Sequence, residues 1–176
     1  SLRNLYSELN INKSSPIFLY QGVLHRGRGI EQVFPLLNKF QSAHYLILGE
    51  GQYIDDLEKK TVELGVQNRV HFFGSVPYLK LMSYTASATI GFSLIEPLSQ
   101  SYEHALPNKI FEYAAVGLPI IATDLPEMNK AITEYNLGYC VPFGDEVALS
   151  KSVEKILLEL TDKKYEPNDQ LFWEAQ

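Results

Sequence analysis

The chain has 176 residues, a formal net charge of −6 and one cysteine. Its length suits one domain, its acidic balance argues against electrostatic binding to nucleic acid, and its cysteine count excludes an internal disulfide and a cysteine-rich zinc site. No apolar run approaches the roughly 20 residues of a membrane-spanning helix, and no signal peptide opens the sequence. We therefore expect a soluble domain located in the cytoplasm.

Apolar runs alternate with amphipathic segments through the first half of the chain. The expected strands are Pro16–Tyr20, His44–Leu48, Arg69–Phe73 and Ala88–Phe92. The expected helices are Gly29–Phe40, Tyr53–Leu64 and Tyr78–Ala86. Pro35 lies inside the first of these helices and should kink it or shift its start, because proline lacks an N–H and clashes with the preceding turn.

The segment Leu106–Asp124 predicts one helix followed by one buried strand. Pro107 suits the first helical turn, Gly117 suits the position just after the helix, and the apolar run Pro119–Thr123 suits a strand covered on both faces. The remaining expected elements are a helix at Pro126–Tyr135, a strand at Tyr139–Val141 and a helix at Glu146–Leu160. This alternation predicts an α/β fold, a Rossmann-like doubly wound parallel sheet of about six strands with helices on both faces.

Ligands of such sheets bind outside the carboxyl ends of the strands, where the strand order reverses. The loops Gln21–Gly29 and Ser93–Ala105, which follow the first and fourth expected strands, should line one crevice there. The helix that begins at Pro107–Lys109 offers free backbone N–H groups, a partial positive charge and an ammonium group, which together favour phosphate. Glu112, one turn further, can accept hydrogen bonds from a diol. This combination predicts a nucleotide site.

Five stretches of the sequence resemble one protein family in the same order. Phe111–Ala122, which reads FEYAAVGLPIIA, is similar to the E-A-M-A-x-G-x-P-V-I-A signature of GT-B retaining glycosyltransferases of group 1 (GT4-like). The other resembling stretches are Gln21–Gly29, Leu46–Gly51, Val70–Gly74 and Phe172–Glu174. The resemblance runs from about Pro16 to the end of the chain, and it implies one half of a GT-B fold, the C-terminal domain that binds the donor.

The resemblance implies transfer of a sugar from a nucleoside-diphosphate donor, UDP- or GDP-linked, to a glycan or lipid-linked acceptor in polysaccharide biosynthesis, without a cofactor or a metal. We expect residues 16–161 to form the donor-binding domain, residues 1–15 to be a linker or helix from a missing N-terminal acceptor domain, and residues 162–176 to be a tail that returns to it. This chain alone should bind the donor weakly and transfer nothing. Any membrane contact, peripheral at the inner membrane, would be made through the missing domain.

The resemblance also implies roles for individual residues. Arg28 should stabilise the departing diphosphate, and Glu112 should bind the ribose hydroxyls. The family's sugar-contacting glutamate has no match, because His104 stands at its position, so either Glu103 or Glu96 is expected to replace it as a catalytic residue. The implied donor-binding residues are Gly22, Arg26, Arg28, Gly29, Gly74, Val76, Pro107, Asn108, Lys109 and Glu112.

One departure from the family concerns the first loop. The family commonly carries an arginine where this chain has Val23, and Arg26 is a candidate to supply that charge from another direction. Two other functions stay open: a sugar-nucleotide 2-epimerase on the same scaffold, and a non-catalytic Rossmann-like binding domain. The histidines show no zinc-ligand spacing, and we expect His44 and His71 to pack at strand ends.

Overall fold

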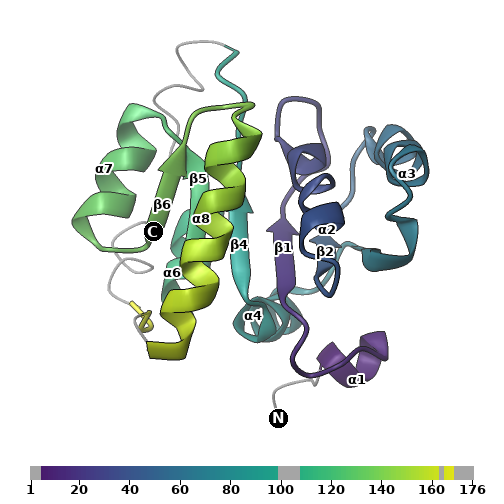
Figure 1. The fold of residues 1–176 in the computed structure, drawn as a ribbon, viewed down its shortest axis with the longest axis horizontal. Helices are drawn as coiled ribbons and strands as arrows, with labels where there is room; N and C mark the ends of the chain where they lie inside the picture. The colour runs from purple at the N-terminus through teal and green to yellow at the C-terminus, as the bar shows by residue number, and fades with distance from the viewer. Residues whose placement is uncertain (1–4, 99–107, 163–164, 169–176) are drawn as a thin grey trace.

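Six parallel strands form one sheet at the centre of the computed structural model, which describes residues 5–98, 108–162 and 165–168 (Figure 1). The order of the strands across the sheet is β3-β2-β1-β4-β5-β6. Their bounds are β1 (Ile17–Gln21), β2 (His44–Leu48), β3 (Val70–Gly74), β4 (Ile90–Ser93), β5 (Ile120–Thr123) and β6 (Gly138–Val141). This is the doubly wound, Rossmann-like order, so the predicted fold class is confirmed.

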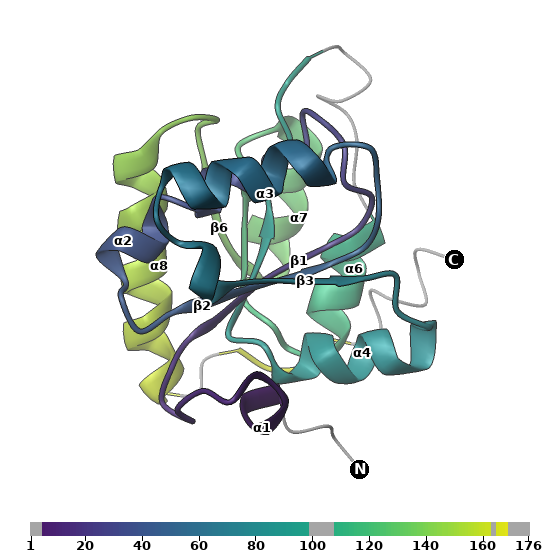
Figure 2. The ribbon, with the colours of Figure 1, turned by 90° about the vertical axis from the view of Figure 1, so that its right-hand side faces the viewer.

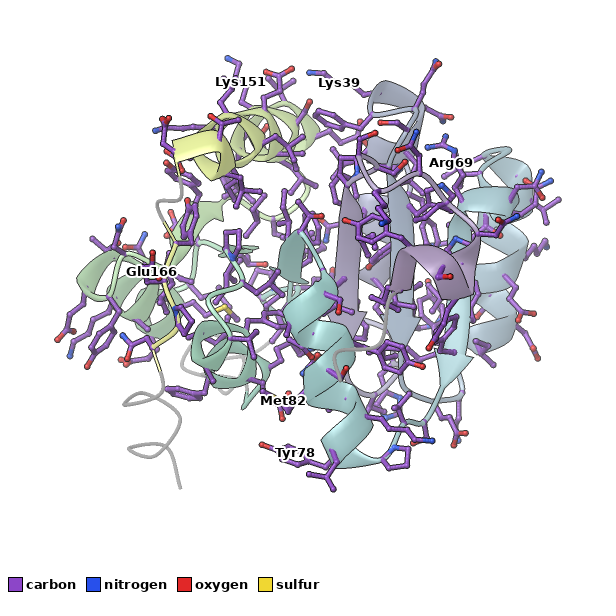
Figure 3. All side chains as sticks on the ribbon, turned by 90° about the horizontal axis from the view of Figure 1, so that it is seen from below. Lys39, Arg69, Tyr78, Met82, Lys151 and Glu166 are labelled. Carbon is purple, nitrogen blue, oxygen red and sulfur yellow. The ribbon has the colours of Figure 1, made fainter. Side chains whose placement is uncertain are left out.

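Helices cover both faces of the sheet (Figure 2). One face carries α2 (Leu36–Lys39), α3 (Ile54–Glu63) and α8 (Glu146–Glu159). The other face carries α1 (Leu5–Leu9), α4 (Tyr78–Ser87), α6 (Asn108–Ala115) and α7 (Pro126–Glu134). Short 3-10 segments are η1 (Ile30–Val33), η2 (Gln67–Arg69) and η3 (Leu160–Asp162). Figure 3 shows the same division, with Lys39 and Lys151 on one side of the molecule and Tyr78 and Met82 on the other.

The central strand β1 has an apolar residue at each of its first four positions because both of its faces are buried. Successive side chains of a strand point to opposite faces. Phe18 and Tyr20 accordingly pack into the core under α2, α3 and α8, whereas Ile17 and Leu19 pack into the core under α1, α4, α6 and α7. The two hydrophobic cores of the domain therefore lie on opposite faces of this strand.

Pro35 divides the helix that the sequence predicts over Gly29–Phe40. The segment consists of the 3-10 turn η1 followed by the short helix α2, with Pro35 as the N-cap residue of α2 at φ −61°. Proline is well tolerated at a helix start, where its missing N–H removes no intrahelical bond. The expected disturbance of this helix is confirmed, and it takes the form of a break.

Gly117 ends α6 as the sequence predicts. Its φ of +70° is a left-handed conformation that glycine adopts without a Cβ penalty. The Leu118 N–H donates to the Tyr113 carbonyl at 3.0 Å and the Gly117 N–H donates to the Ala114 carbonyl at 3.1 Å. These two bonds form a Schellman motif, which turns the chain directly into β5.

Both described ends of the chain pack on this domain. Leu5 of α1 is fully buried in the core, and the Tyr84 hydroxyl donates to Glu8 at 3.1 Å. At the other end, the Tyr165 hydroxyl donates to Glu159 at 2.6 Å and the Asn168 N–H donates to the Ala114 carbonyl. Within the described residues, no helix has the length and apolar character needed to cross a membrane.

Candidate functional site

The strand order reverses between β1 and β4, and the loops that follow these strands both leave at the top of the sheet in Figure 1. A pocket of about 520 Å³ lies at this edge, within the size range of small-molecule sites. Its lining comes from the ends of β1 and β2 and the loops that follow them, the loop after β3, α4 and the first turns of α6. The lining residues are Gln21, Gly22, Val23, Arg28, Leu48, Gly49, Glu50, Ser75, Val76, Leu81, Lys109 and Glu112.

Lys109 brings a buried amine to the pocket from the first turn of α6. Its exposed fraction is only 7%, and its Nζ lies 4.0 Å from the centre of the Tyr20 ring. Burial, followed by the positive charge of Arg28, lowers the pKa of Lys109 to about 7, against an opposing effect of Glu112. The amine is thus poised to gain a proton when an anion enters the pocket.

Glu112 lies one turn along α6 from Lys109, on the same wall of the pocket. Its Oε2 accepts a hydrogen bond from Nε2 of Gln21, the last residue of β1. Burial raises the pKa of Glu112, while the hydrogen bond from Gln21 and the charge of Lys109 lower it. The carboxylate is therefore held in a partly desolvated position where it can accept further hydrogen bonds.

The two arginines of the first loop lie in different surroundings. Arg28 lines the pocket. Its positive charge lowers the pKa of Lys109 and opposes the burial that raises the pKa of Tyr20. Arg26 does not line the pocket: its side chain is 81% exposed, lies 3.4 Å from an Asp56 oxygen and stacks over the Tyr53 ring. The structure therefore gives no support to the expectation that Arg26 replaces the family's loop arginine.

The glycines of the site allow close approach of backbone segments. Gly22 lines the pocket, and a Cβ placed on it would lie 3.1 Å from Lys109 Nζ. Gly29 has φ +69°, and a Cβ there would lie 1.8 Å from the carbonyl oxygen of Leu94 in the loop after β4. Gly29 thus lies against the loop after β4, but none of the described residues of that loop, 93–98, lines the pocket, contrary to the expectation that both loops would do so. Gly74 ends β3 without lining the pocket, but the next residues of that loop, Ser75 and Val76, do line it.

Several predicted site residues lie elsewhere or outside the described residues. Glu103 and Pro107 fall within 99–107, which the structure does not describe, and of Asn108 only its place at the start of α6 is described. Glu96 does not line the pocket; its N–H donates to the Gly27 carbonyl at 2.8 Å, so it lies beside the glycine-rich loop. The choice between Glu96 and Glu103 as sugar-contacting residue stays a prediction.

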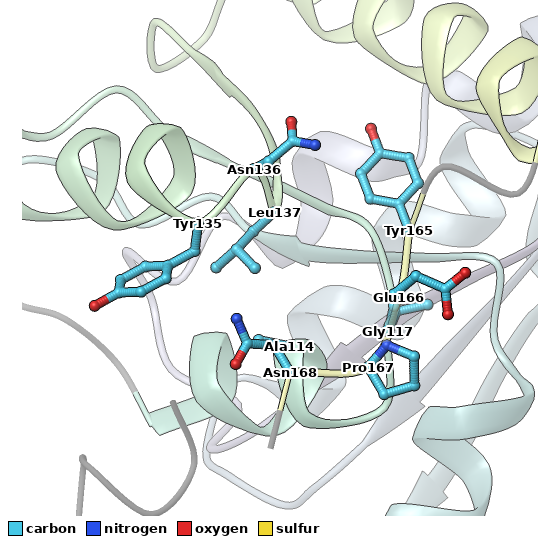
Figure 4. A pocket seen from close by; sticks show the side chains of 10 residues that line it. Ala114, Gly117, Tyr135, Asn136, Leu137, Tyr165, Glu166, Pro167 and Asn168 are labelled. Atoms are coloured by element: carbon cyan, nitrogen blue, oxygen red, sulfur yellow. The ribbon is translucent and has the colours of Figure 1, made fainter. Parts of the chain in front are cut away.

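A smaller pocket of about 250 Å³ lies at the opposite end of α6 (Figure 4). Tail residues Tyr165, Glu166, Pro167 and Asn168 form one wall, and residues 135–137, between α7 and β6, form another. Because the first turns of α6 line the larger pocket and its last turn lines this one, the two pockets are separated by the length of the helix. The tail segment 165–168 therefore does not reach the larger pocket.

Sequence reasoning did not identify Gln21 as a site residue. The side chain is buried, lines the pocket and contacts Glu112. The available signal was a polar residue at the end of an otherwise apolar run, IFLYQ, at the carboxyl end of the central strand. Buried polar side chains need hydrogen-bond partners, but the sequence did not reveal which residue supplied them.

A doubly wound parallel sheet whose switch-point pocket holds two cationic side chains, the carboxylates of Glu50 and Glu112 and a helix N-terminus defines a Rossmann-like domain of the nucleotide-binding class. The sequence model of the family described as glycosyl transferases group 1 matches residues 3–169. The chain belongs to this glycosyltransferase family.

Named relatives agree with this assignment. The chain is 24% identical over 148 residues to the probable glycosyltransferase WbjE of Pseudomonas aeruginosa, covering 82% of this chain and 36% of the relative. It is 23% identical over 157 residues to the lipopolysaccharide core biosynthesis glycosyltransferase LpsE of Rhizobium meliloti, covering 87% of this chain and 43% of the relative. The chain thus spans less than half the length of these relatives.

Solved structures share the fold. Anabaena HepE, whose structure was determined in complex with UDP-glucose, superposes with a TM-score of 0.69 at 17% identity. The match covers 91% of this chain and 43% of HepE. At this identity the likeness concerns the fold, and it confirms the prediction of a GT-B-type Rossmann-like half.

Proposed function

We propose that this chain is the donor-binding half of a retaining glycosyltransferase that takes its sugar from a nucleoside diphosphate. The observation that carries the proposal is the convergence of Arg28, Lys109 and Glu112 on one pocket at the point where the strand order reverses. The three residues come from two segments that lie about 80 positions apart in the sequence. Their charges match the diphosphate and the ribose of one nucleotide.

Each part of the donor has a partner in this arrangement. The diphosphate binds between Arg28, Lys109 and the backbone N–H groups at the start of α6, because both cations and the helix N-terminus favour negative charge. The Glu112 carboxylate accepts hydrogen bonds from the ribose hydroxyls. The base lies near Ser75 and Val76, which line the same pocket.

Charge develops on the diphosphate as the bond to the sugar breaks. Arg28 and the charged form of Lys109 stabilise that charge within a partly desolvated pocket, where such interactions are stronger than in water. In the proposed reaction these protein cations replace a metal, and no cofactor takes part. The sugar keeps its anomeric configuration, and the donor is UDP- or GDP-linked.

The acceptor is bound by another part of the parent protein. Because the chain spans less than half the length of its named relatives, we assign acceptor binding to a preceding N-terminal domain. The acceptor is a glycan or a lipid-linked sugar, in line with the lipopolysaccharide pathway named for LpsE. The parent protein acts in the cytoplasm, and any membrane contact is made by that other domain.

Isothermal titration with UDP and GDP tests donor binding by this chain. The wild-type protein should bind at least one of the two nucleotides, and Glu112→Ala should weaken that binding by about 10-fold, the effect of losing hydrogen bonds to a charged group. Glu134→Ala is the matched control, because Glu134 is an exposed helical glutamate on α7 outside the pocket. If the folded wild-type protein binds neither nucleotide, the proposal is wrong.

A further inference from the structure

Gln21 is a buried amide at the carboxyl end of the central strand. Its exposed fraction is 2%, and its side chain forms part of the pocket wall. The other residues of β1 are apolar or aromatic. A buried amide in such a strand costs free energy unless its donors and acceptor are satisfied. The partners of Gln21 therefore indicate why the strand ends in a polar residue.

The Gln21 amide joins two helices across the end of the sheet. The Thr85 hydroxyl of α4 donates to Gln21 Oε1 at 2.5 Å. On the other side, Gln21 Nε2 donates to Glu112 Oε2 of α6. An ionised carboxylate only accepts hydrogen bonds, so the NH₂ end of the amide has to face Glu112. The oxygen end then faces the Thr85 hydroxyl, whose single proton is shared between Gln21 Oε1 and the Leu81 carbonyl oxygen at 2.8 Å.

The backbone that carries Gln21 is itself held firmly. Gln21 pairs with Leu48 in the parallel ladder between β1 and β2. Its backbone N–H also points to the Tyr113 hydroxyl at 3.3 Å, and that hydroxyl donates to the Phe92 carbonyl of β4 at 3.2 Å. The backbone of Gln21 is thus fixed in place between β2 and β4. Its side-chain amide can therefore hold the Glu112 carboxylate in one plane.

We infer that Gln21 is a positioning residue for the nucleotide donor: it fixes the Glu112 carboxylate for the ribose hydroxyls, and Thr85 fixes Gln21 in turn. This inference rests on the proposed function, in which Glu112 binds the ribose. Without the amide, the carboxylate is free to rotate and loses a donor that compensates its burial. Gln21 then acts on the nucleotide through Glu112 and makes no contribution of its own.

Titrations with UDP or GDP, whichever the wild-type protein binds more tightly, test this role. Gln21→Leu should weaken binding by about 10-fold, the size expected for a hydrogen bond to a charged group. Thr85→Val should weaken binding by about 3-fold, because it acts one step further away. Thr85→Ser, which keeps the hydroxyl, should retain the wild-type affinity. Gln32→Leu is the matched control, since the Gln32 amide also joins two segments but lies outside the pocket.

Two comparisons separate positioning from a general structural effect. In a Glu112→Gln background, Gln21→Leu should change the affinity by less than about 2-fold, because residues that act as a unit are not additive. The 2′-deoxy nucleotide should likewise show a smaller loss with Gln21→Leu than the ribonucleotide shows. If Gln21→Leu fails to fold, the nucleotide affinities of Thr85→Ser and Thr85→Val still test the positioning role.

Two results would overturn the inference while leaving the proposed function intact. One is that Gln21→Leu and Thr85→Val each bind the nucleotide with wild-type affinity, while Glu112→Gln binds it weakly. The other is an equal loss from Gln21→Leu with and without Glu112. A folded wild-type protein that binds neither nucleotide would instead overturn the proposed function and this inference together.

Discussion

Lys109 Nζ lies 4.0 Å from the centre of the Tyr20 ring, so the amine of α6 rests on an aromatic side chain of the central strand. The contact keeps the amine at the pocket wall beside Arg28 and Glu112. A buried amine whose pKa is about 7 is only partly charged near neutral pH. The protonation of Lys109 is therefore sensitive to any anion that binds next to it.

Nucleotide binding should take up protons through Lys109. A bound diphosphate favours the charged amine and raises its pKa above about 7, so near neutral pH up to about half a proton is taken up for each nucleotide bound. The affinity should accordingly fall as the pH rises above neutral. Titration calorimetry in buffers of different ionisation enthalpy measures this uptake. Lys109→Met should abolish it, and an unchanged uptake in that variant would assign the proton to another group.

Arg28 and Arg26 should differ in their effect on binding. Arg28→Ala removes a cation from the pocket wall and should weaken nucleotide binding by about 10-fold or more. Arg26→Ala should change it by less than about 2-fold, because exposed charges are screened by solvent and salt. Titrations at one ionic strength measure both variants. Equal losses would place Arg26 in the site, as the sequence-based expectation had it.

Gly29→Ala should destabilise the protein far more than Gly65→Ala. Both glycines have φ near +70°, but a Cβ on Gly29 would lie 1.8 Å from the Leu94 carbonyl oxygen, whereas a Cβ on Gly65 meets nothing within 4 Å. Backbone strain alone costs about 1–2 kcal/mol, the value expected for Gly65→Ala. Gly29→Ala should cost about 3 kcal/mol or more, because the backbone has to move. Urea unfolding measures both, and similar values would show that the loops are not in close contact.

The pair His44 and His71 should make the protein less stable in acid. His44 Nδ1 and His71 Nε2 are 2.9 Å apart, and burial lowers the pKa of both rings below 6.5, with the charges of His71 and Arg69 also lowering that of His44. The unfolded chain therefore binds protons first as the pH falls below about 6.5, and stability is lost in that range. Because both rings are partly exposed, we expect a loss of about 1 kcal/mol or less.

Urea unfolding above and below that pH, compared with a His44→Gln, His71→Gln double variant, isolates this contribution. The double variant should show a smaller loss of unfolding free energy on acidification than the wild-type protein shows. An identical pH dependence in the two proteins would mean that the pair does not set it.

Much of the fold could be predicted from the sequence because it depends on local patterns. Largely apolar runs such as His44–Leu48 form strands covered on both faces. Gly117 ends its helix in a left-handed conformation, which a glycine at this position predicts. The break at Pro35 also follows from the residue alone. The expectation that His44 and His71 lie near strand ends fits the structure, but their contact with each other depends on the pairing of β2 with β3.

The details of the site depend on contacts between distant segments, which the pattern does not contain. Gln21 meets Thr85 and Glu112 across 64 and 91 positions of the sequence. Arg26 and Arg28 are two positions apart, yet only the folded loop shows which of them lines the pocket. Leu5 lies in a segment expected to link to another domain, and its burial in this core required the three-dimensional arrangement.

A crystal structure of the chain with the tighter-binding nucleotide, UDP or GDP, would show whether the nucleotide binds at the pocket formed by Arg28, Lys109 and Glu112. We expect the diphosphate between Arg28, Lys109 and the first turn of α6, with the ribose hydroxyls on the Glu112 carboxylate. A nucleotide bound elsewhere, or with its ribose directed away from Glu112, would contradict this expectation.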